Sequence, residues 1–217
     1  MKIKCLFLDH DDTIVDSTKH IHYPAFCETL ETLRPNNVLM PYLDFVDYCH
    51  RYGFMHLCLN YYQFSDEEMK IEYQIWKSYT QKQIPDVFNG LKELLINYKK
   101  QGGIIVVISH SEKTEIKRDY LHHFGFEPNE IYGWERPEME RKPHVFPIID
   151  SLAKFNLDAK DCLMLDDMSL GQQMAHKTNV PFAWAAWTHS ENGIEKIASD
   201  LSFADVNAFK EFLELTD

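Results

Sequence analysis

Residues 6–13 read Leu-Phe-Leu-Asp-His-Asp-Asp-Thr, a short apolar run that ends in three carboxylates within four positions. The apolar part, which begins near Ile3, has the length and composition of a buried strand and is too short for a lone helix. Buried strands rarely end in several acids, because like charges repel and each carboxylate loses its hydration. The pattern is therefore typical of a strand whose end faces a crevice that holds a cation.

The composition is that of an ordinary globular protein with an acidic balance. The 217 residues are 45% hydrophobic, and 22 Lys and Arg stand against 34 Asp and Glu, for a net charge of −12. The length allows one large domain or a core with an inserted subdomain. Because no basic cluster or stripe is visible, nucleic-acid binding is disfavoured. Any phosphate site in such a chain must be locally positive.

The cysteines and the apolar runs point to a soluble cytoplasmic protein. The five cysteines are widely spaced, odd in number and without a C-x-x-C pair, which argues against a disulfide framework or a zinc site and for a reducing compartment. No signal peptide is recognised, and no apolar run approaches the length needed to cross a membrane. We expect no membrane partner, and both a monomer and a homodimer are compatible with the sequence.

Most of the chain alternates between strand and helix patterns. Residues 104–108 are a continuous β-branched run, typical of a strand buried on both faces of a parallel sheet. Further short strands are expected near 130–133, 162–165 and 182–187. The intervening segments and residues 206–215 carry helical spacing, with Pro143 in the first turn of one helix.

Residues 17–83 differ, because their apolar residues recur at helical spacing throughout and Ser65 with Glu68 forms a capping-box pattern. We therefore predict an α/β fold, a doubly wound parallel sheet, with an inserted all-helical domain. The core would comprise 1–15 and 85–217, and the helical cap 16–84. Since the chain enters the cap directly after the acidic run, the cap can serve as a lid over that run.

Chemically useful side chains follow several of these predicted elements, and the carboxyl ends of parallel strands meet at one edge of a sheet. The acids suit a hard cation, most simply Mg²⁺, while a lysine and a hydroxyl beside a metal suit phosphate oxygens. A carboxylate that is not fully used by the metal can attack phosphorus, and a second acid can move the proton. The side chains are Asp9, Asp11, Ser109, Lys142, Asp166 and Asp167.

Each of these features has an ordinary alternative when it is taken alone. Ser109 is a common turn residue, Lys142 suits a solvated loop, and adjacent acids can cap a helix. Their occurrence in order, each at the end of the appropriate element, favours one phosphoryl-transfer site. A calcium-binding EF-hand is excluded because Ile14 and His20 stand where Gly and Glu are required. The sequence also lacks a P-loop, G-x-S-x-G and G-x-G-x-x-G.

The sequence resembles the haloacid dehalogenase superfamily, within it the branch similar to phosphoglycolate phosphatases with a helical cap. Residues 6–17 are similar to the first motif of that family, 105–109 to the second, 141–143 to the third and 163–167 to the acidic fourth. The resemblance implies that Asp9 is the nucleophile and a Mg²⁺ ligand. It implies that Asp11 is the general acid and base, with its backbone carbonyl on the metal.

The same resemblance assigns the remaining site residues. Ser109 and Lys142 would hold the transferring phosphoryl group, with His110 and Thr13 as further candidates on the phosphate side and Thr13 also supporting the loop. Asp167 aligns best with the metal-binding acid of the family, and Asp166 would be its partner in binding Mg²⁺.

Three residues depart from the family pattern. Asp12 stands where the family usually has glycine, and His10 lies between the two catalytic acids where an apolar residue is frequent. Gly171 stands where many members have a further acid, a role that Asp166 can take over.

The leading hypothesis is a Mg²⁺-dependent phosphatase that hydrolyses a small phosphorylated metabolite through an aspartyl-phosphate intermediate. One alternative is a phosphomutase, which would place a histidine early in the cap, where Ile21 stands between His20 and His22. Another is a non-catalytic binding protein on the same fold, which usually lacks the nucleophile or the acid. In the cap, Arg51 is a candidate for binding a second anionic group, with a plain surface arginine as the alternative.

Overall fold

The computed structural model describes residues 3–188, 199 and 201–216. The chain divides into two compact units. The core unit runs to Asp16 and resumes at Asp86, and the cap unit comprises Ser17–Pro85.

The core unit is built on a sheet of parallel strands in the order β3-β2-β1-β4-β5-β6. The strand β1, which carries the acidic run at its end, lies between β2 and β4, and each of its residues is buried. Strands of this kind are apolar throughout because helices cover both faces of the sheet. The strands are β1 (Cys5–Leu8), β2 (Ile104–Ile108), β3 (Glu130–Tyr132), β4 (Cys162–Asp166), β5 (Phe182–Ala185) and β6 (Leu201–Phe203). The predicted doubly wound parallel sheet is confirmed.

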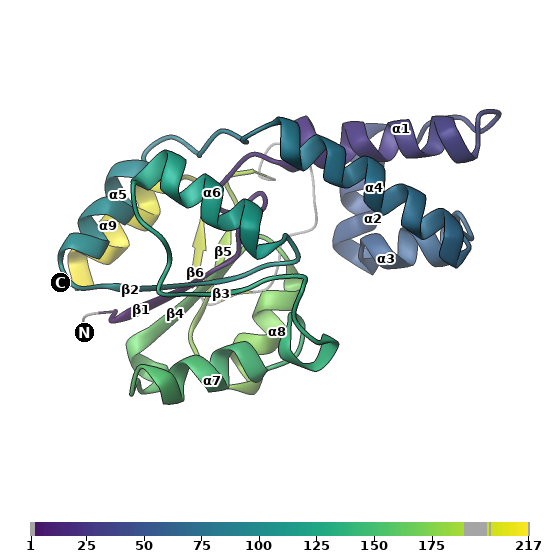
Figure 1. Ribbon diagram of the computed structural model, residues 1–217. Helices are drawn as coiled ribbons and strands as arrows, with labels where there is room; N and C mark the ends of the chain where they lie inside the picture. The colour runs from purple at the N-terminus through teal and green to yellow at the C-terminus, as the bar shows by residue number, and fades with distance from the viewer. Residues whose placement is uncertain (1–2, 189–198, 200, 217) are drawn as a thin grey trace. The chain divides into compact units, whose positions relative to one another are not determined.

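Helices cover both faces of this sheet (Figure 1). Along β1, Leu6 and Leu8 join one buried cluster and Cys5 and Phe7 join the other, as the period of two in a strand requires. The first face carries α5 (Leu91–Lys100), α6 (Lys113–Phe124) and α9 (Val206–Thr216), and the second carries α7 (Phe146–Lys154) and α8 (Ser169–Lys177).

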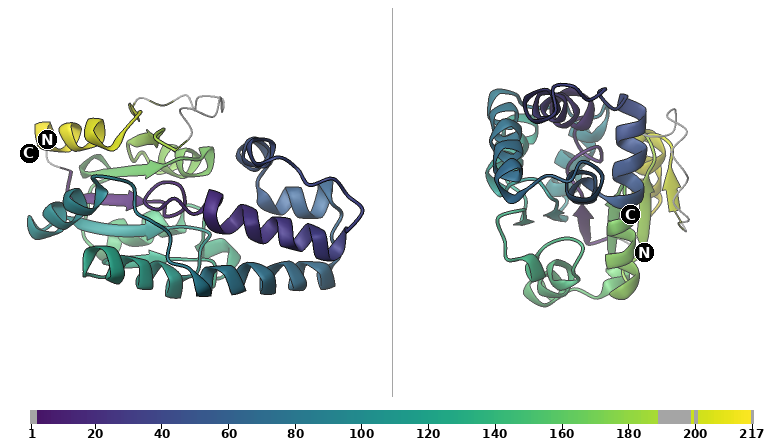
Figure 2. Two further views of the ribbon diagram at one scale, coloured as in Figure 1. Left: turned by 90° about the horizontal axis from the view of Figure 1, so that it is seen from above. Right: turned by 90° about the vertical axis from the view of Figure 1, so that its right-hand side faces the viewer.

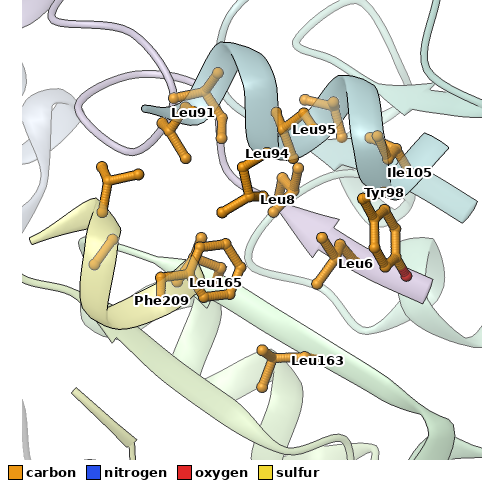
Figure 3. Close-up of a cluster of buried hydrophobic side chains, with 14 of the residues drawn as sticks. Leu6, Leu8, Leu91, Leu94, Leu95, Tyr98, Ile105, Leu163, Leu165 and Phe209 are labelled. Carbon is orange, nitrogen blue, oxygen red and sulfur yellow. The ribbon is translucent and has the colours of Figure 1, made fainter. Parts of the chain in front are cut away.

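The first cluster shows why α5 folds where it does. Leu91, Leu94 and Leu95 recur at helical spacing and face Leu8 and the neighbouring strands (Figure 3). Each leucine that is fully removed from water in this way contributes about 1.5–3 kcal/mol. This packing fixes β1, and therefore fixes the position at which the acidic run begins.

The cap unit is helical throughout its regular structure, as predicted. Helices α1 and α4 lie side by side in all views (Figures 1 and 2). The ring of Phe26 on α1 contacts the rings of Phe45, Phe54 and Tyr62, which form an aromatic core. The elements are α1 (Tyr23–Leu33), α2 (Tyr42–Tyr52), α3 (Phe54–His56) and α4 (Asp66–Lys82), with π-helical turns at Thr18–His22 and Leu57–Tyr61.

The two ends of the cap insertion are neighbours within the core unit. The backbone N–H of Asp16 donates to the carbonyl of Asp86 over 2.9 Å, and Val15 pairs with Val87 in an antiparallel bridge. The chain thus leaves and re-enters the core at one point.

Two details differ from the sequence-based expectations. Strand β6 was not expected, because only three residues form it and Ser202 is exposed, so that no apolar period is visible. Helix α7 begins at Phe146 with Pro147 in its first turn, whereas Pro143 precedes the helix and follows a cis peptide bond. In the described part of the chain, no helix combines the length and the apolarity needed to cross a membrane.

Candidate active site

Three carboxylates meet where the neighbouring strands β1 and β4 end. The backbone N–H of Asp9 donates to the carbonyl of Leu165 over 3.0 Å, which extends the pairing of the two strands by one residue. Asp9, Asp166 and Asp167 each place one carboxylate oxygen within 4.8 Å of the others, and all three residues are buried. The sheet therefore assembles the acids that the sequence places 157 positions apart (9 and 166).

Lys142 supplies positive charge to this group. Its Nζ donates to Asp9 Oδ1 over 3.1 Å and to Asp166 Oδ2 over 2.6 Å, and only 3% of the lysine is exposed. Burial by itself would lower the pKa of Lys142, but Asp166 and Asp9 outweigh it and hold that pKa above its usual value. The lysine is therefore charged at physiological pH.

One lysine does not compensate three buried carboxylates. Burial raises the pKa of Asp9 well above its usual value; Lys142 opposes this, and Asp166 and Asp167 add to it. Burial likewise raises the pKa of Asp166 to about 6, with Lys142 opposing. Such a group fits a divalent cation, which favours the ionised carboxylates and takes oxygen ligands. The donor set contains only oxygens, as Mg²⁺ prefers.

The carboxyl group of Asp11 lies apart from these three. Its Oδ2 accepts hydrogen bonds from Ser109 Oγ over 3.3 Å and from Ser111 Oγ over 2.6 Å. Ser109 Oγ in turn accepts from the backbone N–H of Ser111 over 3.0 Å. The two acids of the D-x-D pair thus have different surroundings: Asp9 faces the lysine and the other acids, and Asp11 faces hydroxyls. Different surroundings are what a nucleophile and a proton carrier need.

Ser111 was not singled out from the sequence. The only signal is its spacing of two from Ser109 directly after a strand, and serine is common in turns. Its contact with a residue 100 positions away is visible only in three dimensions.

Thr13 is fully buried and bonded to the acidic loop of β4. Its hydroxyl donates to Asp167 Oδ1 over 3.2 Å and accepts from the backbone N–H of Asp167 over 3.1 Å. This reciprocal pair ties the loop after β1 to the loop after β4. The hydroxyl is engaged by Asp167, so a direct role on phosphate would require it to leave this partner.

The backbone around Asp12 explains why aspartate can replace glycine there. Asp12 has φ of 57°, a left-handed conformation that glycine adopts freely and that aspartate tolerates better than most residues. Its N–H donates to the carbonyl of Val15 over 2.8 Å, and its carbonyl accepts from Thr188 Oγ1 over 2.6 Å. The turn is closed by N–H groups of Ile14 and Val15 on the carbonyl of His10.

The side chain of His10 holds the same turn in place. The imidazole is 2% exposed, and its Nε2 lies 3.1 Å from Oδ2 of the buried Asp119 on α6. Arg118 Nε donates to the other oxygen of Asp119 over 2.7 Å. The side chain of the residue between the two catalytic candidates therefore contacts Asp119 and links their loop to α6.

Gly171 and Asp166 form a close contact that accounts for the third departure from the family pattern. A Cβ built on Gly171 would lie 2.2 Å from Asp166 Oδ2, so the carboxylate occupies the place that a side chain on α8 would need. Oδ1 of Asp166 accepts from the backbone N–H of Met168 over 2.8 Å, which leaves Oδ2 for Lys142. Asp166 thus lies in the space beside Gly171 and contacts the lysine.

His110, the last candidate, is exposed at the rim of this group. Its Nε2–H donates to the backbone carbonyl of Lys142 over 2.9 Å, and its ring meets that of Trp134 edge-on. His110 therefore contacts the backbone of Lys142 and the ring of Trp134.

Comparison with known proteins finds a matching family model and similar solved structures. The family model described as haloacid dehalogenase-like hydrolase matches residues 6–185. A predicted phosphoglycolate phosphatase from Haemophilus somnus has a similar structure, with 19% identity, coverage of 100% of this chain and 99% of that chain, and a TM-score of 0.76.

Two further solved structures are similar. A haloacid dehalogenase-like family hydrolase from Streptococcus pneumoniae has 19% identity, coverage of 97% and 98%, and a TM-score of 0.68. CbbY from Rhodobacter sphaeroides in complex with phosphate has 15% identity, coverage of 98% and 96%, and a TM-score of 0.71. The comparison with curated proteins gives no match.

Proposed function

The chain belongs to the haloacid dehalogenase-like hydrolase family, and on that basis we propose that it is a Mg²⁺-dependent phosphatase that acts on a small phosphorylated metabolite. The observation that carries the proposal is the difference in surroundings between the two acids of the D-x-D pair. Asp9 contacts Lys142 beside two further acids, and Asp11 is held separately by two serine hydroxyls. Phosphoryl transfer through a covalent intermediate needs both a nucleophile and a proton carrier.

In the first half of the reaction, a carboxylate oxygen of Asp9 attacks the phosphorus atom. The bond between phosphorus and the leaving oxygen breaks, and Asp11 gives its proton to that oxygen. The product alcohol leaves, and the phosphoryl group remains on Asp9 as an acyl-phosphate. In the second half, a water molecule attacks the phosphorus, Asp11 takes one of its protons, and inorganic phosphate is released with Asp9 restored.

Lys142 and Ser109 are the groups that would hold the phosphoryl oxygens. The lysine is charged, buried and already 3.1 Å from the proposed nucleophile, so it can stabilise charge on the transferring group without reorganisation. His110 would act from the rim through its contact with the Lys142 carbonyl. Thr13 would act indirectly by fixing Asp167.

Asp9, Asp166, Asp167 and the backbone carbonyl of Asp11 are the groups that would hold Mg²⁺. When bound, the ion would supply positive charge to the phosphoryl oxygens and offset the mutual repulsion of the acids.

Carbon–halogen hydrolysis and mutase chemistry are less well supported. Dehalogenases of this superfamily lack the second acid, which is present here as Asp11. In the cap, Ile21 is buried, and His22 accepts a hydrogen bond from Trp76 Nε1 over 3.0 Å. The position at which a mutase would carry its histidine is occupied by Ile21, and Nδ1 of the neighbouring His22 is already bonded to Trp76.

The test is hydrolysis of p-nitrophenyl phosphate with Mg²⁺ by the wild type and by Asp9→Asn. We expect turnover by the wild type and a loss of about 10⁴-fold or more in the variant, because the nucleophile is gone. Asp158→Asn is the matched control, since this acid precedes β4 at the opposite edge of the sheet and its side chain is 74% exposed. Turnover that survives in Asp9→Asn would rule out the nucleophile, and an inert wild type would favour a binding protein.

A further inference from the structure

Within the part of the chain that the structure describes, Arg141 differs from the other arginines in having no acidic partner. Each of the others contacts a carboxylate: Arg34 contacts Glu68, Arg51 contacts Asp47, Arg118 contacts Asp119, and Arg136 contacts Glu130 and Glu140. Among the described residues, no ion pair involves Arg141. In a chain with a net charge of −12, an unpaired arginine is unexpected on electrostatic grounds.

The guanidinium of Arg141 is nevertheless held in place. Its central carbon lies 3.7 Å from the centroid of the Trp134 ring, and Nη1 donates to the Trp134 carbonyl over 2.7 Å. Stacking on an aromatic ring fixes the plane of the guanidinium and leaves the N–H groups along its edge able to bind an acceptor. The arginine is therefore oriented in advance, at little further cost in side-chain entropy.

The Arg141–Trp134 pair is connected to Lys142 and His110, two of the residues proposed to bind phosphate. Arg141 directly precedes Lys142 in the chain, and His110 donates to the Lys142 carbonyl while its ring meets Trp134 edge-on. The backbone N–H of Trp134 donates to the carbonyl of Ser111 over 3.0 Å, and Ser111 holds Asp11. These contacts fix the pair to the loop that carries Lys142 and to the loop after β2, whose serines hold Asp11.

The loop can approach so closely because residue 133 is glycine. A Cβ on Gly133 would lie 2.9 Å from the carbonyl oxygen of Ser111 and 2.9 Å from the backbone nitrogen of Lys113. Any larger residue would push Trp134 away from the strand-end loops. The placement of Arg141 beside the site is thus built into the backbone.

We propose that Arg141, stacked on Trp134, binds a second anionic group of the substrate. The inference rests on the proposed phosphatase function and narrows it to phosphomonoesters that carry a carboxylate or a second phosphate. Both groups present the paired oxygens that the edge of a guanidinium recognises. The cap arginine considered from the sequence, Arg51, is a weaker candidate because its Nε already donates to Asp47 over 2.9 Å.

The experiment compares ethyl phosphate, 2-phosphoglycolate and ethylene glycol bisphosphate in the wild type, Arg141→Gln and Arg136→Gln. Arg136 is a matched control on the same loop, since it also stacks on a ring, that of Tyr132 at 4.5 Å, but has carboxylate partners. We expect Arg141→Gln to raise KM about 10-fold to 100-fold for 2-phosphoglycolate or for ethylene glycol bisphosphate, the two esters with a second anionic group, which is the usual effect of losing a charge-assisted contact. Its kinetics on ethyl phosphate should remain those of the wild type.

2-Phosphoglycolate carries a carboxylate and ethylene glycol bisphosphate carries a second phosphate. Comparing the two shows which kind of anionic group Arg141 binds. An equal effect of Arg141→Gln on all three esters, or no effect on any, would overturn the inference. The same would follow if Arg136→Gln had the same effect as Arg141→Gln.

Binding without turnover separates this inference from the proposed function. Asp9→Asn, alone and combined with Arg141→Gln, is titrated with each ester in the presence of Mg²⁺ by calorimetry. If the wild type hydrolyses none of the esters, but Asp9→Asn binds 2-phosphoglycolate or ethylene glycol bisphosphate more tightly than ethyl phosphate and loses this preference when Arg141→Gln is added, the phosphatase proposal fails and the anion site stands. If the affinity does not depend on Arg141, the anion site fails.

Discussion

Gly171 and Asp166 share a space at the end of β4 that holds only one side chain. A glycine-to-alanine substitution within a helix normally stabilises a protein by about 1 kcal/mol. Here the new Cβ would meet Asp166 Oδ2 at 2.2 Å, so the carboxylate must move away from Lys142. We expect Gly171→Ala to lower kcat at least about 10-fold and to destabilise the fold by about 1–3 kcal/mol, as measured by steady-state kinetics and urea unfolding.

Gly102→Ala is the control for this prediction. Gly102 has φ of 89° with no atom near its would-be Cβ, and it precedes β2 at the edge away from the acids. Alanine there should cost about 1–2 kcal/mol of stability through backbone strain and leave kcat unchanged. If Gly171→Ala behaved as Gly102→Ala does, the contact with Asp166 would have no functional meaning.

At the scale of single residues, the sequence predicts groups whose role follows from their position at a strand end. Asp9 and Asp166 are of this kind, since a parallel sheet collects strand ends at one edge. The pairing of His10 with Asp119 is different, because it depends on the face of α6 that turns inward. Many polar residues lie on that helix, and none of them is marked in the sequence as the partner of a histidine.

Helix α4 of the cap unit carries a buried glutamate, Glu72, whose ionised form destabilises the fold. Glu72 is 7% exposed, and burial raises its pKa to about 7, with a smaller opposing effect of His22. The folded chain therefore binds a proton more tightly than the unfolded chain, whose glutamate has its usual pKa near 4.3. The destabilisation of the fold by ionised Glu72 is absent at pH values below the pKa of the unfolded chain. It grows as the pH rises and is complete above about pH 7.

Glu72→Gln removes the titrating group and should therefore stabilise the protein most above about pH 7, where the wild-type glutamate is ionised. We expect an increase of about 2 kcal/mol in the unfolding free energy at pH 8, falling to less than half at pH 5, as measured by urea unfolding at both values. Glu67→Gln, on the same helix with a side chain 79% exposed, should change little at either pH. An equal gain for Glu72→Gln at both pH values would contradict a raised pKa.

Among the elements, those with a clear apolar period could be predicted and the short ones could not. The β-branched run of β2 and the capping box of α4 are strong local signals, and the structure has both. Strand β6 has three residues, too few for a period to be seen, and pairs with β5 only because the fold brings it there. At α7 the prediction of Pro143 in the first turn is wrong, because Pro147 fits the same helix-start rule and is the proline that lies there.

For the whole molecule, the excess of negative charge at the sheet edge predicts a response to divalent cations. Mg²⁺ that binds only the folded chain stabilises it by about 2.7 kcal/mol at 100 times the dissociation constant. We expect a rise of several degrees in the thermal midpoint with saturating Mg²⁺, reversed by EDTA, as measured by calorimetry.

Asp167→Asn should greatly reduce this response, because it removes one of the three carboxylates that meet there. Asp158→Asn should respond as the wild type does, since its side chain lies exposed beyond the start of β4. Equal shifts in Asp167→Asn and the wild type would place the ion somewhere else on the protein.

The hydrogen bond between Asp16 and Asp86 has a consequence for how such a protein changes over generations. Since the ends of the cap insertion are already joined inside the core, the core makes no demand on the length or composition of what lies between them. Insertions, deletions and exchanges in that segment leave the sheet and its acids as they are. Selection can therefore change the cap while the chemistry of the core is kept.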